Sequence, residues 1–214
     1  MSLGKFITLE GGEGTGKSTQ AKLLRAYLES CGLQVVLTRE PGGSPGAELI
    51  RHLLVEGAPD RWDPLSEYLL FSAARRNHVQ NTIVPALTEG CWVICDRFYD
   101  SSRVYQGVAR GLNLEFMDNV YEMVAEGIVP DLTFLFDLPA ELGHDRVQVR
   151  MGREDRFEQM GVAFHQKVRN AYLKLAEGNP DRFRVIDARG YPEAIADDVI
   201  KVLVSKFPEL HSRS

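Results

Sequence analysis

The chain has 214 residues, of which 44% are hydrophobic, and a formal net charge of -5. This length and hydrophobic content predict one compact domain over residues 1–214 with a substantial core. The acidic balance disfavours a nucleic-acid coat or a membrane-surface protein, because both need a large basic field. We therefore expect small or locally recognised partners.

Other features of the sequence concern the cellular compartment. The three cysteines come without a second cluster of ligands that would make a metal site, so they are typical of thiols in a reducing cytoplasm. The chain begins directly in a strand-like segment, and no apolar run reaches the roughly 18 residues of a membrane span. We expect a cytoplasmic protein without a membrane or nucleic-acid partner.

Short apolar runs alternate with longer amphipathic ones along the chain. In chain order we expect strand 5–10, helix 16–30, strand 34–40, helices 46–55 and 64–82, strand 92–96, helix 114–126, strand 132–138, helices 140–150 and 158–177, strand 183–187 and helix 191–206. Several strand runs are apolar on both faces, as buried parallel strands are. The order predicts an α/β fold, a doubly wound five-stranded parallel sheet with surrounding helices and right-handed crossovers.

A glycine-rich segment, EGGEGTGKST, joins the first strand to the first helix. Gly11, Gly16, Lys17 and Ser18 fill the pattern G-x-x-x-x-G-K-[ST] in the strand-to-helix context that a phosphate loop requires. Backbone N–H groups and the helix N-terminus favour a polyphosphate, Lys17 meets its outer phosphates, and Ser18 can hold magnesium. The alternative, a tight turn without a ligand, explains the glycines alone. The motif predicts nucleoside triphosphate binding but does not indicate the reaction.

A second candidate site lies in the segment WVICDRFYDSS. Asp96 ends an apolar strand, where doubly wound sheets bind ligands and where a carboxylate can order a magnesium-bound water. Arg97 follows, and its planar fork suits a phosphate group. An isolated Asp-Arg pair is more often a capping pair. The phosphate loop on the first strand favours the functional interpretation.

The segment DRVQVRMGREDRFE carries arginines that share roughly one helical side: Arg146, Arg150, Arg153 and Arg156. A mobile basic flap could close on a triphosphate and supply an arginine to the transferring phosphoryl group. Arginine runs are also common on solvated helix faces with acidic partners. Spacing alone does not decide between the two interpretations.

Five motifs carry a resemblance to a known family: EGGEGTGKST, TREPGGS, LFSAAR, DRFYDSSRVYQG and GREDRFE. With them the chain resembles the thymidylate kinases, P-loop nucleoside monophosphate kinases that phosphorylate dTMP to dTDP with ATP and so supply dTTP synthesis, from about residue 4 to residue 205. The resemblance implies a lid segment at about 143–157, magnesium with ATP as co-substrate, and a homodimer.

The same resemblance, together with the phosphate-loop motif, assigns the site residues. The ATP-binding set is Gly11, Gly12, Glu13, Gly14, Thr15, Gly16, Lys17, Ser18, Thr19 and Arg146. The substrate-binding set is Glu13, Arg39, Arg51, Phe71, Arg75, Arg97, Ser102, Tyr105 and Gln106. Ser18 and Asp96 form the metal set, and the catalytic set is Lys17 and Arg97 with Arg150 or Arg153.

Within the substrate set, the resemblance places Glu13 at the sugar 3′-hydroxyl, Phe71 against the thymine face and Arg75 at a thymine carbonyl. Plain core packing is the alternative for Phe71. The three phosphate-binding arginines are Arg39, Arg51 and Arg97. Ser102 lies near the ring edge, the Tyr105 ring favours deoxyribose sterically, and Gln106 assists base recognition.

The phosphate loop contains no arginine, so the chain resembles the type with a catalytic arginine in the lid. One extra residue at Met151 leaves the choice between Arg150 and Arg153 open. We expect direct phosphoryl transfer. A phosphate monoester, with a second pKa of about 6, is already largely ionised at neutral pH, so no strong general base is needed.

Two other functions fit the phosphate loop. Another small-molecule kinase of the same architecture would differ at Phe71, Arg75, Ser102 and Tyr105. A GTP-binding regulatory switch is disfavoured because the sequence has no N-K-x-D guanine-reading segment. A purely structural role would leave the phosphate loop and the arginines unexplained.

Overall fold

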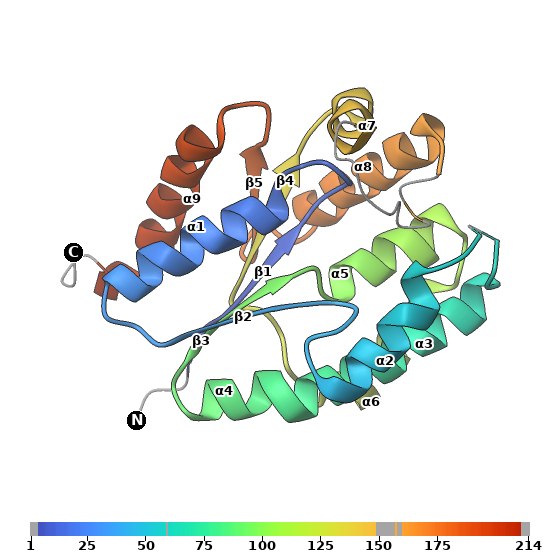
Figure 1. Ribbon diagram of the computed structural model, residues 1–214, viewed down its shortest axis with the longest axis horizontal. Helices are drawn as coiled ribbons and strands as arrows, with labels where there is room; N and C mark the ends of the chain where they lie inside the picture. The colour runs from blue at the N-terminus through green and yellow to red at the C-terminus, as the bar shows by residue number, and fades with distance from the viewer. Residues whose placement is uncertain (1–3, 59, 149–156, 158–159, 211–214) are drawn as a thin grey trace.

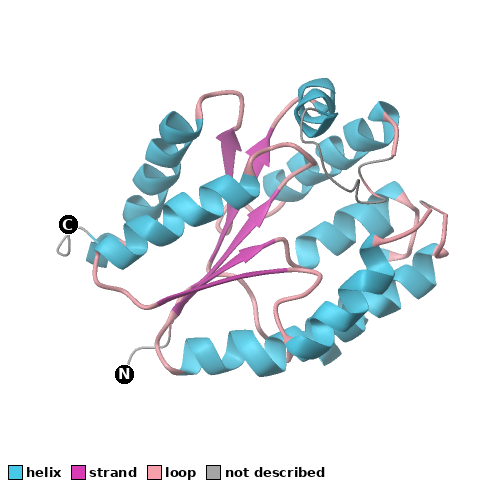
Figure 2. Cartoon of the chain, viewed as in Figure 1, coloured by secondary structure: helices cyan, strands magenta, loops and turns pink. Residues whose placement is uncertain are grey.

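A computed structural model describes residues 4–58, 60–148, 157 and 160–210. The sheet is formed by β1 (Phe6–Glu10), β2 (Val35–Arg39), β3 (Trp92–Asp96), β4 (Leu132–Asp137) and β5 (Phe183–Asp187). Its five strands are parallel, in the order β2-β3-β1-β4-β5 (Figure 1). Helices surround this sheet (Figure 2). The expected fold class, a doubly wound parallel sheet, is confirmed.

Helices connect the strands and cover the sheet. They are α1 (Lys17–Ser30), α2 (Pro45–Val55), α3 (Pro64–His78), α4 (Val84–Thr88), α5 (Tyr99–Ser102), α6 (Leu114–Ala125), α7 (Ala140–Gln148), α8 (Val162–Glu177) and α9 (Pro192–Lys206). Two π-helical segments, η1 (Val79–Ile83) and η2 (Arg103–Ala109), and a 3-10 turn, η3 (Pro208–Leu210), complete the described helices.

The two faces of the sheet carry separate cores, because successive strand residues point to opposite sides. One face is covered by α1 and α9 (Figure 1). There, Ile7 and Leu9 pack in a cluster with the apolar stripes of these two helices. On the other face, Phe6 packs with α3, α4 and α6, while Leu135 packs with η2 and α8. Every residue of β1 is buried, which explains its near-continuous apolar sequence.

The helices differ from the sequence expectations at three places. The helix expected to end at 82 continues as far as Thr88 through η1 and α4. The helical stretch of α5 and η2 was not predicted, because buried polar residues such as Asp100 and Gln106 weaken its apolar periodicity. The helix expected from 158 begins at Val162, directly after Gly161. Residues 149–150 of the helix expected at 140–150 lie outside the described residues.

Parallel pairing brings the candidate segments to one edge of the sheet. Leu9 of β1 and Arg39 of β2 both lie opposite Asp96 of β3. The phosphate loop, the segment after Asp96 and the loop after β2 therefore leave the sheet side by side, at the carboxyl edge where such sheets bind ligands. Among the described residues, no helix has the length and hydropathy needed to cross a membrane.

Candidate functional site

The phosphate loop depends on glycine at two close approaches. Gly11 has φ 139°, and a Cβ atom there would lie 2.5 Å from the carbonyl oxygen of Phe136. Gly14 has φ 70°, and its Cβ atom would lie 2.2 Å from the carbonyl oxygen of Gly143 on α7. Any side chain would clash at either place. The path of the loop therefore requires glycine at both positions. Helix α1 begins directly after the loop, at Lys17, at the carboxyl edge of the sheet.

Lys17 is buried in the curve of this loop. Its Nζ donates to the carbonyl oxygens of Gly12 at 2.7 Å and Gly11 at 3.2 Å, and to Oγ1 of Thr15 at 3.3 Å. Burial and the nearby Arg97 cation lower the pKa of Lys17 to about 8, against the opposing effect of neighbouring carboxylates. A bound anion at this place would raise the pKa of Lys17 again and favour its charged ammonium form. The side chain is therefore suited to binding a triphosphate.

Ser18 and Asp96 form the candidate magnesium position. The Ser18 hydroxyl donates to Oδ2 of Asp96 at 2.7 Å, across the gap between α1 and the end of β3. Among the described residues, no group of three or more His, Cys, Asp or Glu side chains could hold a metal alone. A hydroxyl with a carboxylate fits Mg²⁺, which takes oxygen ligands and binds through few protein groups with substrate phosphates and waters.

Arg97 follows Asp96 with φ 70°, a left-handed backbone conformation that is uncommon for a residue with a side chain. The guanidinium points into the site, where Nη2 donates to Oε1 of Glu13 at 2.6 Å. The ion pair forms with Glu13 rather than with Asp96, contrary to the capping-pair alternative. Nη1 donates to the Gly11 carbonyl at 3.0 Å and to Ser101 Oγ at 3.2 Å.

Glu13 has partners on the side away from the phosphate loop. Its Oε1 also accepts a hydrogen bond from the Tyr105 hydroxyl at 3.1 Å. Although burial opposes ionisation, Arg97 and then Lys17 hold the pKa of Glu13 below its usual value. The carboxylate is therefore charged at neutral pH and acts as the acceptor of this part of the site.

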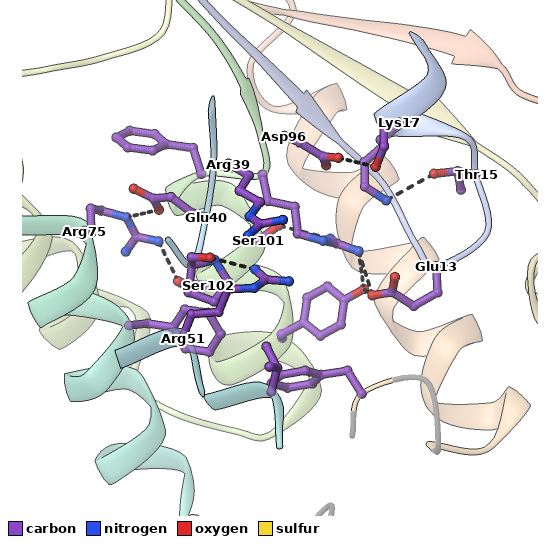
Figure 3. A pocket seen from close by; sticks show the side chains of 18 of the residues that line it. Glu13, Thr15, Lys17, Arg39, Glu40, Arg51, Arg75, Asp96, Ser101 and Ser102 are labelled. Atoms are coloured by element: carbon purple, nitrogen blue, oxygen red, sulfur yellow. Dashed lines mark hydrogen bonds and ion pairs between the residues drawn. The ribbon is translucent and has the colours of Figure 1, made fainter. Parts of the chain in front are cut away.

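Arg75 is the deepest cation of the site and is 1% exposed. Its Nε donates to Oε2 of Glu40 at 2.8 Å, and its Nη2 donates to the Ser102 hydroxyl at 3.0 Å (Figure 3). Its Nη1 is buried and has no hydrogen-bond partner among the described residues. Because an unpaired buried donor is costly, the position is suited to a ligand that brings an acceptor.

One cavity gathers most of the predicted residues. Its lining includes Glu13, Gly14, Thr15, Gly16, Lys17, Ser18, Arg39, Arg51, Phe71, Arg75, Asp96, Arg97, Ser102, Tyr105 and Gln106. Gly11, Gly12 and Thr19 belong to the loop and to α1 but do not line this cavity. The arrangement places a polyphosphate cradle, a cluster of guanidinium groups and an aromatic pocket in one continuous space.

Comparisons with known proteins agree over nearly the whole chain. The family model described as Thymidylate kinase matches residues 9–199. A thymidylate kinase of Rhizorhabdus wittichii is 48% identical over 206 residues, covering 96% of this chain and 99% of its own. One from Caulobacter vibrioides is also 48% identical, over 97% and 99% of the two chains. The crystal structure of thymidylate kinase from Ehrlichia chaffeensis superposes with a TM-score of 0.77 at 35% identity, covering 94% and 99%.

The chain belongs to the thymidylate kinase family. It is thus a member of a family of nucleoside monophosphate kinases, and the resemblance stated from the five motifs is confirmed. The residue roles assigned from that resemblance are not tested by family membership and stay predictions.

The remaining predicted residues of this thymidylate kinase family member are placed as follows. Arg39 pairs with Glu48 at 3.2 Å, and Nη1 of Arg51 donates to the Pro41 carbonyl at 2.6 Å. Arg146 does not line the cavity, but its Nη1 donates to the Ala188 carbonyl at 3.0 Å in the loop after β5. Arg150 and Arg153 lie outside the described residues, as does Arg156.

Sequence reasoning missed several residues that support the site. Glu40 holds both Arg75 and, through Oε1 at 3.1 Å, the ring of His78. Ser101 bonds Arg97 and also Glu10, whose pKa is raised to about 7 by burial and by Asp100. The only available signal was that Glu10 ends a largely apolar strand and Glu40 comes directly after another strand, where a buried carboxylate needs a partner.

Arg103 had no explanation in the sequence. It forms an ion pair with Asp118 of α6 at 3.4 Å and is not part of the cavity. Its position six residues after Arg97 in the same segment makes it a useful comparison residue for experiments.

Proposed function

We propose that the chain phosphorylates dTMP to dTDP with ATP by direct in-line phosphoryl transfer. The observation that carries this proposal is the continuity of one cavity from Lys17, at the phosphate loop, to Nη1 of Arg75 at its other end, a donor without a partner in the described part of the chain. A nucleoside triphosphate fits the first end, and a base with a carbonyl acceptor fits the second. The acceptor phosphate then lies between them, beside Arg97.

On the donor side, the loop from Gly11 to Thr19 cradles the ATP phosphates with its backbone N–H groups. Lys17 neutralises charge on the outer phosphates. Ser18 and Asp96 would hold magnesium, which supplies further charge neutralisation when it is bound. Arg146, beside the loop after β5, is proposed to lie near the adenine ring.

On the acceptor side, the proposal gives each residue a polar or steric role. Phe71, which lies 6.2 Å from the ring of Phe157, stacks on the thymine, and Arg75 donates from Nη1 to the C4 carbonyl. Ser102 holds Arg75 in place. The Tyr105 ring limits space at the sugar 2′ position, and Glu13 accepts from the 3′-hydroxyl.

The transfer step requires positioning and charge neutralisation. Arg97, with Arg39 and Arg51, holds the dTMP phosphate so that one of its oxygens attacks the γ-phosphorus of ATP, while the bond to the β-phosphate oxygen breaks. The attacking oxygen is already ionised, so no side chain acts as a base. The lid at about 143–157, with Arg150 or Arg153 as its catalytic arginine, stays a prediction within one proposed domain of residues 1–214.

A panel of acceptors tests the proposed function. Purified protein with ATP and Mg²⁺ is expected to phosphorylate dTMP, with dCMP and dGMP at least about 100-fold poorer in kcat/KM. The cytosine of dCMP lacks the N3–H and C4 carbonyl edge that Arg75 faces, and the two-ring base of dGMP is larger than a pyrimidine. A coupled assay of ADP release measures all three acceptors. Turnover of another small molecule with no turnover of dTMP would favour a different kinase of the same architecture.

We also propose a homodimer in the cytoplasm. Exposed apolar side chains lie on three helices that pack together, α2 with α3 and α3 with α6: Leu49, Leu53, Leu65, Leu69, Phe116 and Met123. Exposed apolar side chains on neighbouring helices are suited to contact with a second copy of the same chain. Sedimentation is expected to give about twice the 24.0 kDa of one chain, and a monomer at micromolar concentration would contradict the proposal. Buried free thiols at Cys31, Cys91 and Cys95 support a reducing compartment.

A further inference from the structure

Two fully buried side chains lie behind the base end of the cavity. Gln106, on η2, lines the cavity and is 1% exposed, and Glu67, on α3, is 0% exposed. The side-chain Nε2 of Gln106 donates to Oε1 of Glu67 at 2.7 Å. The other oxygen of Glu67 lies 2.7 Å from Nη1 of Arg110, whose Nη2 donates to the Trp62 carbonyl at 2.8 Å.

This arrangement fixes which end of the amide faces which neighbour. A carboxylate paired with an arginine is ionised and can only accept hydrogen bonds, so the amide nitrogen of Gln106 must be the end that faces Glu67. The amide oxygen then points the opposite way. Within the described residues, the Gln106 side chain makes no other hydrogen bond, which leaves its oxygen as an acceptor for the cavity.

The cavity therefore presents a donor and an acceptor at its base end. Nη1 of Arg75 is the donor, and Oε1 of Gln106 is the acceptor. A 4-oxo pyrimidine has a C4 carbonyl next to an N3–H group, which is the complementary pair. A 4-amino pyrimidine has an amino group next to an N3 lone pair, so that donor would meet donor and acceptor would meet acceptor.

We propose that Glu67 is the positioning residue that sets base specificity, by holding the Gln106 amide so that its oxygen faces N3–H of a 4-oxo pyrimidine nucleotide. This inference rests on the proposed function, since it places a pyrimidine monophosphate in this cavity. Glu67 acts through Gln106 and does not touch the nucleotide. Arg110 neutralises the buried carboxylate of Glu67, since an unpaired buried charge would strongly destabilise the fold.

The contrasting possibility is that the Glu67–Arg110 pair only anchors η2 to α3. If the role is structural, a change of Glu67 would weaken the binding of every nucleotide by the same factor. A role in base reading would change the ratio between two nucleotides that differ only at the base edge. 5-Methyl-dCMP provides that comparison, because it keeps the methyl group, sugar and phosphate of dTMP and differs at C4 and N3 alone.

The experiment measures Kd for dTMP and 5-methyl-dCMP, by calorimetry or by competition, in the wild type and in Glu67→Gln. The new amide can donate as well as accept, so the Gln106 amide loses its fixed orientation. The ratio Kd(5-methyl-dCMP)/Kd(dTMP) is expected to fall about tenfold or more, and the ratio Kd(dUMP)/Kd(dTMP) is expected to stay constant. An unchanged first ratio overturns the inference.

Two further variants show whether Glu67 acts through Gln106. Gln106→Leu alone is expected to lower the ratio, and adding Glu67→Gln to it is expected to have no further effect on the ratio. A further fall in the double variant would reject the positioning role. Glu29→Gln, the same change at an exposed carboxylate of α1, is the matched control and should leave both constants unchanged.

A destabilised Glu67→Gln protein would not end the test. Glu67→Asp keeps the charge for Arg110 but shortens the reach to Gln106, and the ratio is expected to fall at least about threefold; no change in that ratio would overturn the inference. Failure of the proposed function is distinguishable, because then the wild type itself would not prefer dTMP. Preference for dTMP with a ratio sensitive to Gln106→Leu and insensitive to Glu67→Gln rejects the role of Glu67 alone.

Discussion

Lys17→Ala is expected to lower kcat by at least about 10³-fold while the protein stays folded. The ammonium is the cation that the phosphate loop encloses, and among the described residues it bonds only the carbonyls of Gly11 and Gly12 and the Thr15 hydroxyl. Within the described part of the chain, its removal therefore breaks no ion pair. The lost charge is needed where negative charge shifts during transfer, and water cannot replace it at the same place.

Single-turnover rates with saturating ATP and dTMP measure this loss, with thermal unfolding as the check on folding. Lys22→Ala, at an exposed position of the same helix, is the control and should keep the wild-type rate. Because the pKa of Lys17 is about 8, ATP binding at pH 8 to 9 is also expected to take up a proton. Calorimetry in buffers of different ionisation enthalpy detects this uptake. In the kinetic experiment, a Lys17→Ala rate within tenfold of the wild type would remove Lys17 from the mechanism.

Arg97→Lys is expected to lower kcat/KM for dTMP by about 10²-fold to 10³-fold, with little change in the KM for ATP. The Arg97 fork reaches Glu13 through one nitrogen and the Gly11 carbonyl and Ser101 through the other. A single ammonium cannot make both sets of contacts. It would also leave the acceptor phosphate with one donor group in place of a planar pair.

Steady-state kinetics with dTMP varied at saturating ATP measure this effect. The same change at Arg103, which pairs with Asp118 in the same segment and lies outside the cavity, should alter kcat/KM less than about threefold. An equal loss in the two variants would show that the segment is merely destabilised. A loss confined to the KM for ATP would instead assign Arg97 to the donor side.

The sequence allowed the sheet and the phosphate loop to be predicted because both depend on local patterns. A buried parallel strand such as β1 has a near-continuous apolar sequence, and Gly11 and Gly16 mark a turn in which both residues have a positive φ. Asp96 and Arg97 could be predicted for the same reason, since their place at a strand end is a property of a short segment. The features that could be predicted are therefore those that depend on residues close to one another in the sequence.

Contacts between distant segments could not be predicted in the same way. Glu67 and Gln106 are 39 positions apart, and only the packing of η2 against α3 brings them within 2.7 Å. The helical stretch of α5 and η2 was missed since its buried side chains are partly polar, so no apolar stripe marks it. Buried Glu10 and Glu40 gave a weak signal because their partners come from elsewhere in the chain.

The Arg97–Glu13 ion pair has a consequence for which anions the free enzyme admits. The guanidinium is already matched with a carboxylate at 2.6 Å, so an incoming anion must exchange with Glu13 and gains only the difference between the two partners. Free inorganic phosphate has no sugar hydroxyl to offer the displaced carboxylate. With Glu13 at the sugar 3′-hydroxyl, as proposed above, a nucleotide would offer that hydroxyl in return. The pair would then favour whole nucleotides over the simple ions that surround the enzyme.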